Sequence, residues 1–343
     1  MSEMLNTTPQ LADDVILSVR HVSKQFDSKG VCVRAVSDVS FEVRKGETIG
    51  IVGESGCGKT TLGRCIVRAH EPTEGEVLYR TLSGEVVDIT KVGKEQLKEI
   101  RKEIQMIFQD PYSSLNPRMT VLDIIKEPLK ANYPKMPKAE MDQKAKEMAE
   151  KVGLNPTYLM RYPHAFSGGQ RQRIGIARAL ILEPQVIVCD EAVSALDVSI
   201  QAQVINLLRD LQKDLNLTYL FISHDLSVVE HISDKVGVMY LGKMVEFGNT
   251  EELFKRPMHP YTEALLSAVP VADPTIQIKR IPLKGEIPNP ANPPSGCYFH
   301  ERCHYCTEKC TQVAPEYKEL APNHFVACHH AEELKLRGFD YDE

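Results

Sequence analysis

Apolar residues along this chain gather in short runs that end in polar or glycine-rich sequence. The clearest runs cover residues 49–52, 104–108, 186–189 and 219–223. Apolar runs of this length, bounded by turn-forming residues, predict buried strands. Because segments with helical spacing lie between them, the pattern predicts an α/β protein.

Two segments show that helical spacing. One has apolar residues at 174, 177 and 180, directly after Ser-Gly-Gly. The other follows a turn-rich stretch at 110–117 and carries an apolar stripe on one face, formed by Met141, Ala145, Met148, Ala149 and Val152. The stripe predicts the core of a small helical subdomain over about residues 110–170.

Composition narrows the possible classes of protein. With 343 residues, two or three domains are expected, and 42% hydrophobic with 26% charged residues is typical of a globular chain. The net charge of −6 argues against a nucleic-acid-binding protein. The first residues do not form a secretory signal, and no apolar run reaches about 18 residues. We therefore expect a cytosolic location, where thiols stay reduced.

The apolar run at 49–52 leads into a phosphate-binding loop. Residues 53–60 read GESGCGKT, between a predicted strand and a predicted helix. The glycines allow backbone N–H groups to converge on phosphates, Lys59 adds a positive charge, and the hydroxyl of Thr60 can bind Mg²⁺. The predicted nucleotide-binding residues are Gly53, Ser55, Gly56, Cys57, Gly58, Lys59, Thr60 and Thr61.

Two carboxylates follow the apolar run at 186–189. Asp190 is suited to hold the metal ion, and Glu191 is suited to polarise the attacking water. An Asp-Glu pair after a strand is usually a solvated strand end. Together with the loop at 53–60, it predicts a nucleotide-hydrolysing site.

The segment before these carboxylates resembles the signature motif of ABC ATPases. Residues 166–170 read FSGGQ, where that family usually has LSGGQ. The resemblance implies a P-loop ABC-type fold with an antiparallel β part near the N-terminus. It also implies a head-to-tail dimer, in which the signature of one subunit covers ATP bound to the other. The residues that would bind nucleotide in trans are Ser167, Gly168, Gly169, Gln170 and Asp197.

Further positions match this family in order. Gln109 matches the Q-loop, which implies a role in catalysis and in Mg²⁺ binding, and His224 matches the switch histidine. Phe26 matches the aromatic residue that lies against adenine. One departure is Ala192, where the family usually has proline. Because Glu191 and His224 are intact, we expect ATP hydrolysis, with a non-hydrolysing subunit as the alternative.

Five of the nine cysteines lie in the last 47 residues. In a reduced compartment, such a cluster indicates metal binding more than free thiols in a loop. Four thiolates suit either Zn²⁺ or a [4Fe–4S] cluster, and the spacing does not decide between them. The proline-rich segments before the cluster, 256–261 and 287–294, predict an extended connector.

With His-Pro-Tyr at 259–261 and the block GCYFHERC at 296–303, this C-terminal region is similar to that of ATPases from oligopeptide and dipeptide importers. The resemblance assigns an iron–sulfur cluster to Cys297, Cys303, Cys310 and Cys328, and leaves Cys306 without a role. It implies an ATPase domain over residues 15–250 and a C-terminal extension over 251–343.

The resemblance also implies the partners of the chain. It indicates the F-type subunit of an importer, at the cytoplasmic face of the membrane. This subunit would pair with a D-type ATPase on two permease subunits, and an extracytoplasmic protein would deliver the peptide. A soluble ABC ATPase is the rival interpretation, but the chain has one P-loop and one signature. The cargo stays open among dipeptides, oligopeptides, nickel complexes and sugars.

Overall fold

The computed structural model describes residues 11–28, 30–110, 112–269 and 280–339. Its centre is an eight-stranded sheet with the order β11-β12-β10-β9-β3-β8-β7-β6. The strands β3, β6, β7, β8 and β9 pair in parallel, whereas β9/β10, β10/β12 and β12/β11 are antiparallel. The bounds are β3 Thr48–Val52, β6 Ile104–Ile107, β7 Val186–Asp190, β8 Thr218–Ile222, β9 Lys235–Tyr240, β10 Lys243–Asn249, β11 Lys318–Ala321 and β12 His324–Val326.

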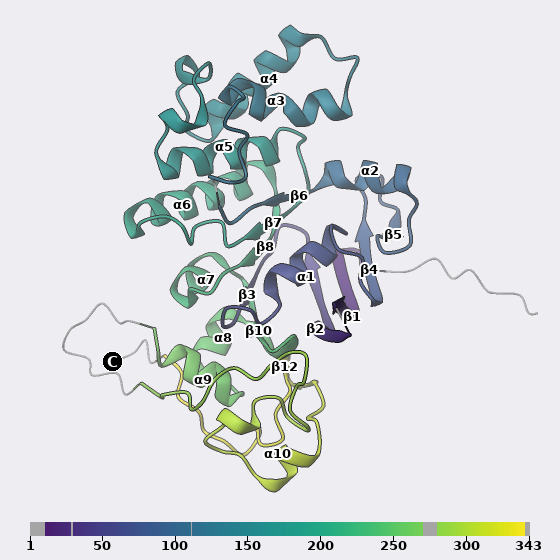
Figure 1. Cartoon of the computed structure of the whole chain (residues 1–343), viewed down its shortest axis with the longest axis vertical. Helices are drawn as coiled ribbons and strands as arrows, with labels where there is room; N and C mark the ends of the chain where they lie inside the picture. Colours follow the sequence, from purple (N-terminus) through teal and green to yellow (C-terminus); the bar gives the residue numbers. More distant parts are fainter. Residues whose placement is uncertain (1–10, 29, 111, 270–279, 340–343) are drawn as a thin grey trace, which may run out of the picture.

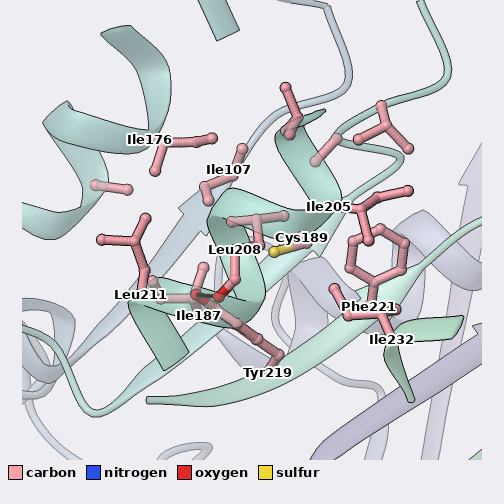
Figure 2. Close-up of a cluster of buried hydrophobic side chains, with 14 of the residues drawn as sticks. Ile107, Ile176, Ile187, Cys189, Ile205, Leu208, Leu211, Tyr219, Phe221 and Ile232 are labelled. Atoms are coloured by element: carbon pink, nitrogen blue, oxygen red, sulfur yellow. Dashed lines mark hydrogen bonds between the residues drawn. The ribbon is translucent and has the colours of Figure 1, made fainter. Parts of the chain in front are cut away.

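The parallel strands at the centre of this sheet explain the apolar runs in the sequence. All residues of β3, β7 and β8 are buried, because both faces of the sheet are covered. On the side drawn in Figure 2, strand residues such as Ile187 and Phe221 pack against Ile205 and Leu208 of a covering helix. Tyr219 is also fully buried, and its hydroxyl donates a hydrogen bond to the Leu208 carbonyl at 3.0 Å. The predicted α/β class is therefore confirmed.

A second, four-stranded antiparallel sheet comes mostly from the N-terminal region, as predicted. Its order is β2-β1-β4-β5, with β1 Val15–Ser28, β2 Val31–Arg44, β4 Glu74–Arg80 and β5 Val86–Asp88. The two sheets share one buried cluster, in which the rings of Phe41 and Phe247 stack with centroids 6.0 Å apart.

Helices cover the sheets, and some of the helices form a separate group at one end of the molecule (Figure 1). That group comprises α3 Val121–Asn132, α4 Lys138–Lys151 and α5 Gly168–Leu180. The predicted apolar stripe of α4 is buried. None of the helices in the described part has the length and apolar character needed to cross a membrane. The other helices are α1 Lys59–Ile66, α2 Lys94–Glu103, α6 Val198–Leu215, α7 Leu226–Ile232, α8 Thr250–Lys255, α9 Pro260–Leu266 and α10 Glu308–Gln312.

The C-terminal region lies at the opposite end from this helical group (Figure 1). It is joined to the large sheet, because β12 pairs with β10 through Glu246↔Val326 and Phe247↔Phe325. The prediction of an extended connector over 256–261 is wrong for its last two residues. There Pro260 starts helix α9, since proline is tolerated at the first helical position. Part of the predicted extension, residues 270–279 and 340–343, lies outside the described residues.

Candidate nucleotide site and cysteine cavity

The loop between β3 and α1 has the backbone that the glycine spacing predicts. Gly53, Gly56 and Gly58 have φ values of +150°, +79° and +106°. At Gly58 a Cβ atom would lie 2.1 Å from the carbonyl oxygen of Ala35, so both the conformation and the space require glycine. The other predicted positions, Ser55, Cys57 and Thr61, lie on the same loop and on the first turn of α1.

Lys59 is folded back onto this loop. Its side chain is 4% exposed, and its Nζ donates hydrogen bonds to the carbonyl oxygens of Gly53 at 2.8 Å and Glu54 at 3.0 Å. The ammonium group is thus held over the loop. From there it can exchange carbonyl oxygens for phosphate oxygens.

Thr60 and Asp190 meet between the loop and the end of β7. The Thr60 hydroxyl donates a hydrogen bond to Oδ1 of Asp190 at 2.6 Å. Asp190 is 2% exposed, and burial raises the pKa of its carboxyl group. A hydroxyl and a carboxylate are hard oxygen ligands, so the donor set fits Mg²⁺.

The three predicted catalytic residues also meet. Oε2 of Glu191 accepts a hydrogen bond from Nε2 of Gln109 at 2.7 Å and lies 3.3 Å from Nδ1 of His224. Glu191 has a positive φ of 48°, which is uncommon for a residue with a side chain and is found in strained turns at functional sites. Its backbone N–H donates to the Ile222 carbonyl, which fixes the turn against β8.

The signature residues lie elsewhere, at the N-terminus of α5. Ser167 caps this helix, and Ser167 and Gln170 form a reciprocal capping box. Asp197 caps the next helix in sequence, α6, where its side chain accepts a hydrogen bond from the Ile200 N–H at 3.0 Å. Gly169 is buried against Ile200 of α6, whereas Ser167, Gln170 and Asp197 are exposed. Among the described hydrogen bonds, none joins these residues to the loop at 53–61.

Phe26 lies on β1 and is 36% exposed. Its ring meets that of His70 edge-on, with centroids 5.3 Å apart, and Nζ of Lys24 lies 5.0 Å from its centroid. An aromatic ring that is partly exposed can stack on a base. Among the described contacts, none joins the Phe26 ring to the loop at 53–61.

A cleft of about 480 Å³ opens beside Gln109. Phe108 and Gln109 line it just after β6, Ser113 lines it from the predicted turn segment, and Arg178 and Asp190 line it from the core. The cleft therefore extends from the surface of the helical group to the carboxylate of Asp190.

The structure brings the four predicted cysteine ligands to one place. Cys297, Cys303, Cys310 and Cys328 line a small cavity of about 10 Å³, together with side chains such as His300 and His330. Cys306 is exposed and does not line it. Burial raises the pKa of the Cys297 thiol to about 11 and of the Cys303 thiol to about 12. Among the described residues, however, no three Cys, His, Asp or Glu side chains lie close enough to hold a metal ion. The metal prediction is therefore not confirmed.

Sequence reasoning missed one feature of the loop. Glu54 is bound by Arg302, which lies 248 residues further along the chain. Neither residue stands out by spacing or by composition, so no sequence signal pointed to this contact.

Comparisons with known proteins agree with this geometry. The ABC transporter family matches residues 36–194, and the family described as oligopeptide/dipeptide transporter, C-terminal region, matches residues 245–310. The chain is 56% identical over 326 residues to the oligopeptide transport ATP-binding protein AppF of Bacillus subtilis, covering 92% of this chain and 97% of the relative. It is 52% identical to the oligopeptide transport ATP-binding protein OppF of Haemophilus influenzae, with 92% and 94% covered.

Among solved structures, one neighbour is the ATP-binding cassette MJ0796 as a dimer bound to ADP and phosphate after hydrolysis. The TM-score is 0.62 at 27% identity, and the match covers 68% of this chain and 99% of the neighbour. The chain therefore belongs to the family of ATP-binding subunits of oligopeptide ABC transporters, and it is an ABC-type ATPase.

Proposed function

We propose that this chain hydrolyses ATP to drive import of oligopeptides or dipeptides across the cytoplasmic membrane, as a peripheral subunit on its cytoplasmic face. The observation that carries the ATPase part is the convergence of Gln109 and His224 on Glu191, next to the Thr60–Asp190 pair. The peptide cargo rests on the names of the relatives and on the match of the C-terminal region.

In this mechanism Lys59 leaves the loop carbonyls and binds the β- and γ-phosphates. Thr60, Asp190 and Gln109 would hold Mg²⁺, which would supply positive charge to neutralise the phosphates. Glu191 accepts a proton from the attacking water as general base. Oε2 of Glu191 accepts a hydrogen bond from the Gln109 amide. A turn of this amide away from Oε2 on nucleotide binding would free the carboxylate and so couple catalysis to binding.

The exposed caps of α5 and α6 serve the second nucleotide. Ser167, Gly168, Gly169, Gln170 and Asp197 would face ATP bound to the other ATPase, a D-type subunit, in a head-to-tail dimer. The exposure of Ser167, Gln170 and Asp197 at two helix N-termini supports this, because free N–H groups there attract anions. Phe26, whose ring is partly exposed, would stack on adenine.

The cleft beside Gln109 is the proposed docking site for a helix of a permease subunit. Two permeases would sit above the ATPase pair, and an extracytoplasmic protein would deliver the peptide. A helix seated there would contact the residues flanking Gln109. Movement of the permease would therefore reach Glu191 through a single side chain.

Co-purification with the membrane partners tests this function. The complex, reconstituted with the binding protein, should show peptide-stimulated ATP hydrolysis and peptide uptake, and both should be lost in Glu191→Gln. Stimulation by a nickel complex or a sugar, and not by peptides, would overturn the cargo. Normal hydrolysis by the chain without any membrane partner would favour a soluble ABC ATPase.

We also propose that the cysteine cavity holds a [4Fe–4S] cluster, with Zn²⁺ as the competing ion. The support is that the four thiols line one cavity, while Cys306 lies outside it. A single zinc ion needs its thiolates within about 2.3 Å of one point. The described side chains are not gathered that tightly. A cluster has a larger core, so the lining, which now leaves room for about one water molecule, would have to move apart on loading.

Anaerobic purification decides between these metals. Iron with visible absorbance is expected in the wild type and in Cys306→Ser, and its loss is expected in Cys303→Ser. Stoichiometric zinc without iron would overturn the cluster.

A further inference from the structure

The C-terminal region reaches the phosphate-binding loop through Arg302. Nη1 and Nη2 of Arg302 donate hydrogen bonds to Oε2 and Oε1 of Glu54 at 2.6 and 3.0 Å. Arg302 is 5% exposed, and a two-pronged pair with so little water around it is geometrically well defined. Nε of Arg302 also bonds the Lys284 carbonyl at 3.3 Å, so the guanidinium group is held from both sides.

Glu54 carries a negative charge in a loop built to bind phosphates. Its own carbonyl oxygen accepts a hydrogen bond from Lys59, so its backbone is part of the cradle. Without a cation beside it, its carboxylate would repel the polyphosphate. Removal of Arg302 would leave the Glu54 carboxylate, whose side chain is 25% exposed, without its partner. Arg302 therefore neutralises Glu54 and fixes its direction.

A second contact holds the backbone of the same residue. The N–H of Glu54 donates a hydrogen bond to the hydroxyl of Tyr261 at 2.9 Å. Tyr261 lies on α9 and is fully buried, with its ring against those of Tyr240 and Phe299, at centroid distances of 4.8 and 5.3 Å. Phe299 and Arg302 belong to the short segment between Cys297 and Cys303. Side chain and backbone of Glu54 are thus both fixed by the C-terminal region.

We propose that Arg302 is a positioning residue for ATP binding, which acts through Glu54 and makes the affinity of the loop depend on the docked C-terminal region. This inference rests on the proposed nucleotide site at residues 53–61. Arg302 itself does not touch the nucleotide. Its effect is on the charge and direction of Glu54, with Tyr261 as the second support.

The test is binding of MgATP to the full chain, together with the KM and kcat of the reconstituted transporter. Arg302→Ala should weaken ATP binding and raise KM by about tenfold, the typical effect of a lost charged hydrogen bond, with a smaller change in kcat. The double variant Glu54→Gln/Arg302→Ala should regain most of the affinity, because the unpaired charge is gone. The ATP affinity of Arg302→Lys should lie between that of the wild type and that of Arg302→Ala. Lys318→Ala, which removes an exposed cation of the same region, is the matched control and should bind ATP normally.

Two further variants keep the outcome decisive. Lys59→Ala should lose ATP binding. If it does and Arg302→Ala binds like the wild type, the positioning role is wrong; if Lys59→Ala also binds normally, the proposed nucleotide site itself is wrong. Should Arg302→Ala fail to fold, Tyr261→Phe removes the hydroxyl at Glu54 with little change in packing. It should weaken ATP binding severalfold, and unchanged affinity in that folded variant would overturn the proposal.

Discussion

Gln109 and Glu191 are joined by a hydrogen bond of 2.7 Å between Nε2 of the amide and Oε2 of the carboxylate. The two residues come from different segments, since Gln109 follows β6 and Glu191 follows the neighbouring strand β7. In parallel strands the carboxyl ends lie at the same edge of the sheet. This bond therefore joins the lining of the surface cleft to the predicted catalytic carboxylate.

Glu191→Gln is expected to keep ATP binding and to abolish turnover. The amide has nearly the same shape but cannot accept a proton from water, and loss of a general base costs about 10²–10⁴ in rate. The ATP-bound dimer should then accumulate in its closed form, which size-exclusion chromatography with MgATP would detect. Turnover at the normal rate would show that the base is another residue.

Much of this site was predictable because its signals are local. The loop at 53–60 is set by glycines whose positive φ angles leave few alternatives, and Asp190 and Glu191 follow a strand that is recognisable by its apolar run. The Thr60–Asp190 contact follows once β3 and β7 lie on either side of β8 in one sheet.

The rest depends on contacts between distant parts of the chain. The strand β12 has three residues, and its pairing with β10 rests on backbone hydrogen bonds that carry no sequence pattern. Helix α9 was not predicted, because the prolines of the segment 256–261 indicated an extended connector. The Glu54–Arg302 pair was not predicted, because the two residues lie 248 positions apart in the sequence. Four cysteines in one cavity were foreseen from the resemblance, whereas the small size of the cavity was not.

Gly169→Ala should destabilise the chain, although alanine usually favours a helix. A Cβ atom at Gly169 would lie 2.4 Å from Cγ2 of Ile200, so α5 and α6 must move apart, and overpacking of this kind costs about 1–3 kcal/mol. At Gly168 the nearest atom would be 3.5 Å away, on Leu196, so Gly168→Ala is the matched control. Thermal unfolding of both variants measures the difference. Equal melting temperatures would contradict the close approach of the two helices.

Glu246→Ala should loosen the C-terminal region from the sheet. The carboxylate is fully buried on β10 and accepts hydrogen bonds from the N–H groups of Met258 and His259, and it bonds Nε2 of His324 on β12 at 2.8 Å. Leaving these groups unpaired should cost about 2–5 kcal/mol in the free energy of unfolding. The rate of hydrogen exchange at the β12 amides should therefore increase. The control is Glu251→Ala, an exposed carboxylate paired with Lys255, which should leave exchange in β12 unchanged.

Asp190→Asn should raise the melting temperature of the chain while it abolishes Mg²⁺-dependent ATP hydrolysis. Burial raises the pKa of Asp190 in the folded chain, so the unfolded chain, with the lower pKa, binds fewer protons between the two values. By linkage, this group lowers stability as pH rises through that window, and the loss persists at neutral pH. Asparagine has no charge to bury and keeps an oxygen for the Thr60 hydroxyl, so the variant should melt at a higher temperature near pH 7. It should also lose Mg²⁺-dependent ATP hydrolysis. In the wild type, Mg²⁺ competes with the proton for this carboxylate, so apparent Mg²⁺ affinity should weaken as pH is lowered through its raised pKa. A variant that melts at a lower temperature and still responds to Mg²⁺ would show that Asp190 is structural.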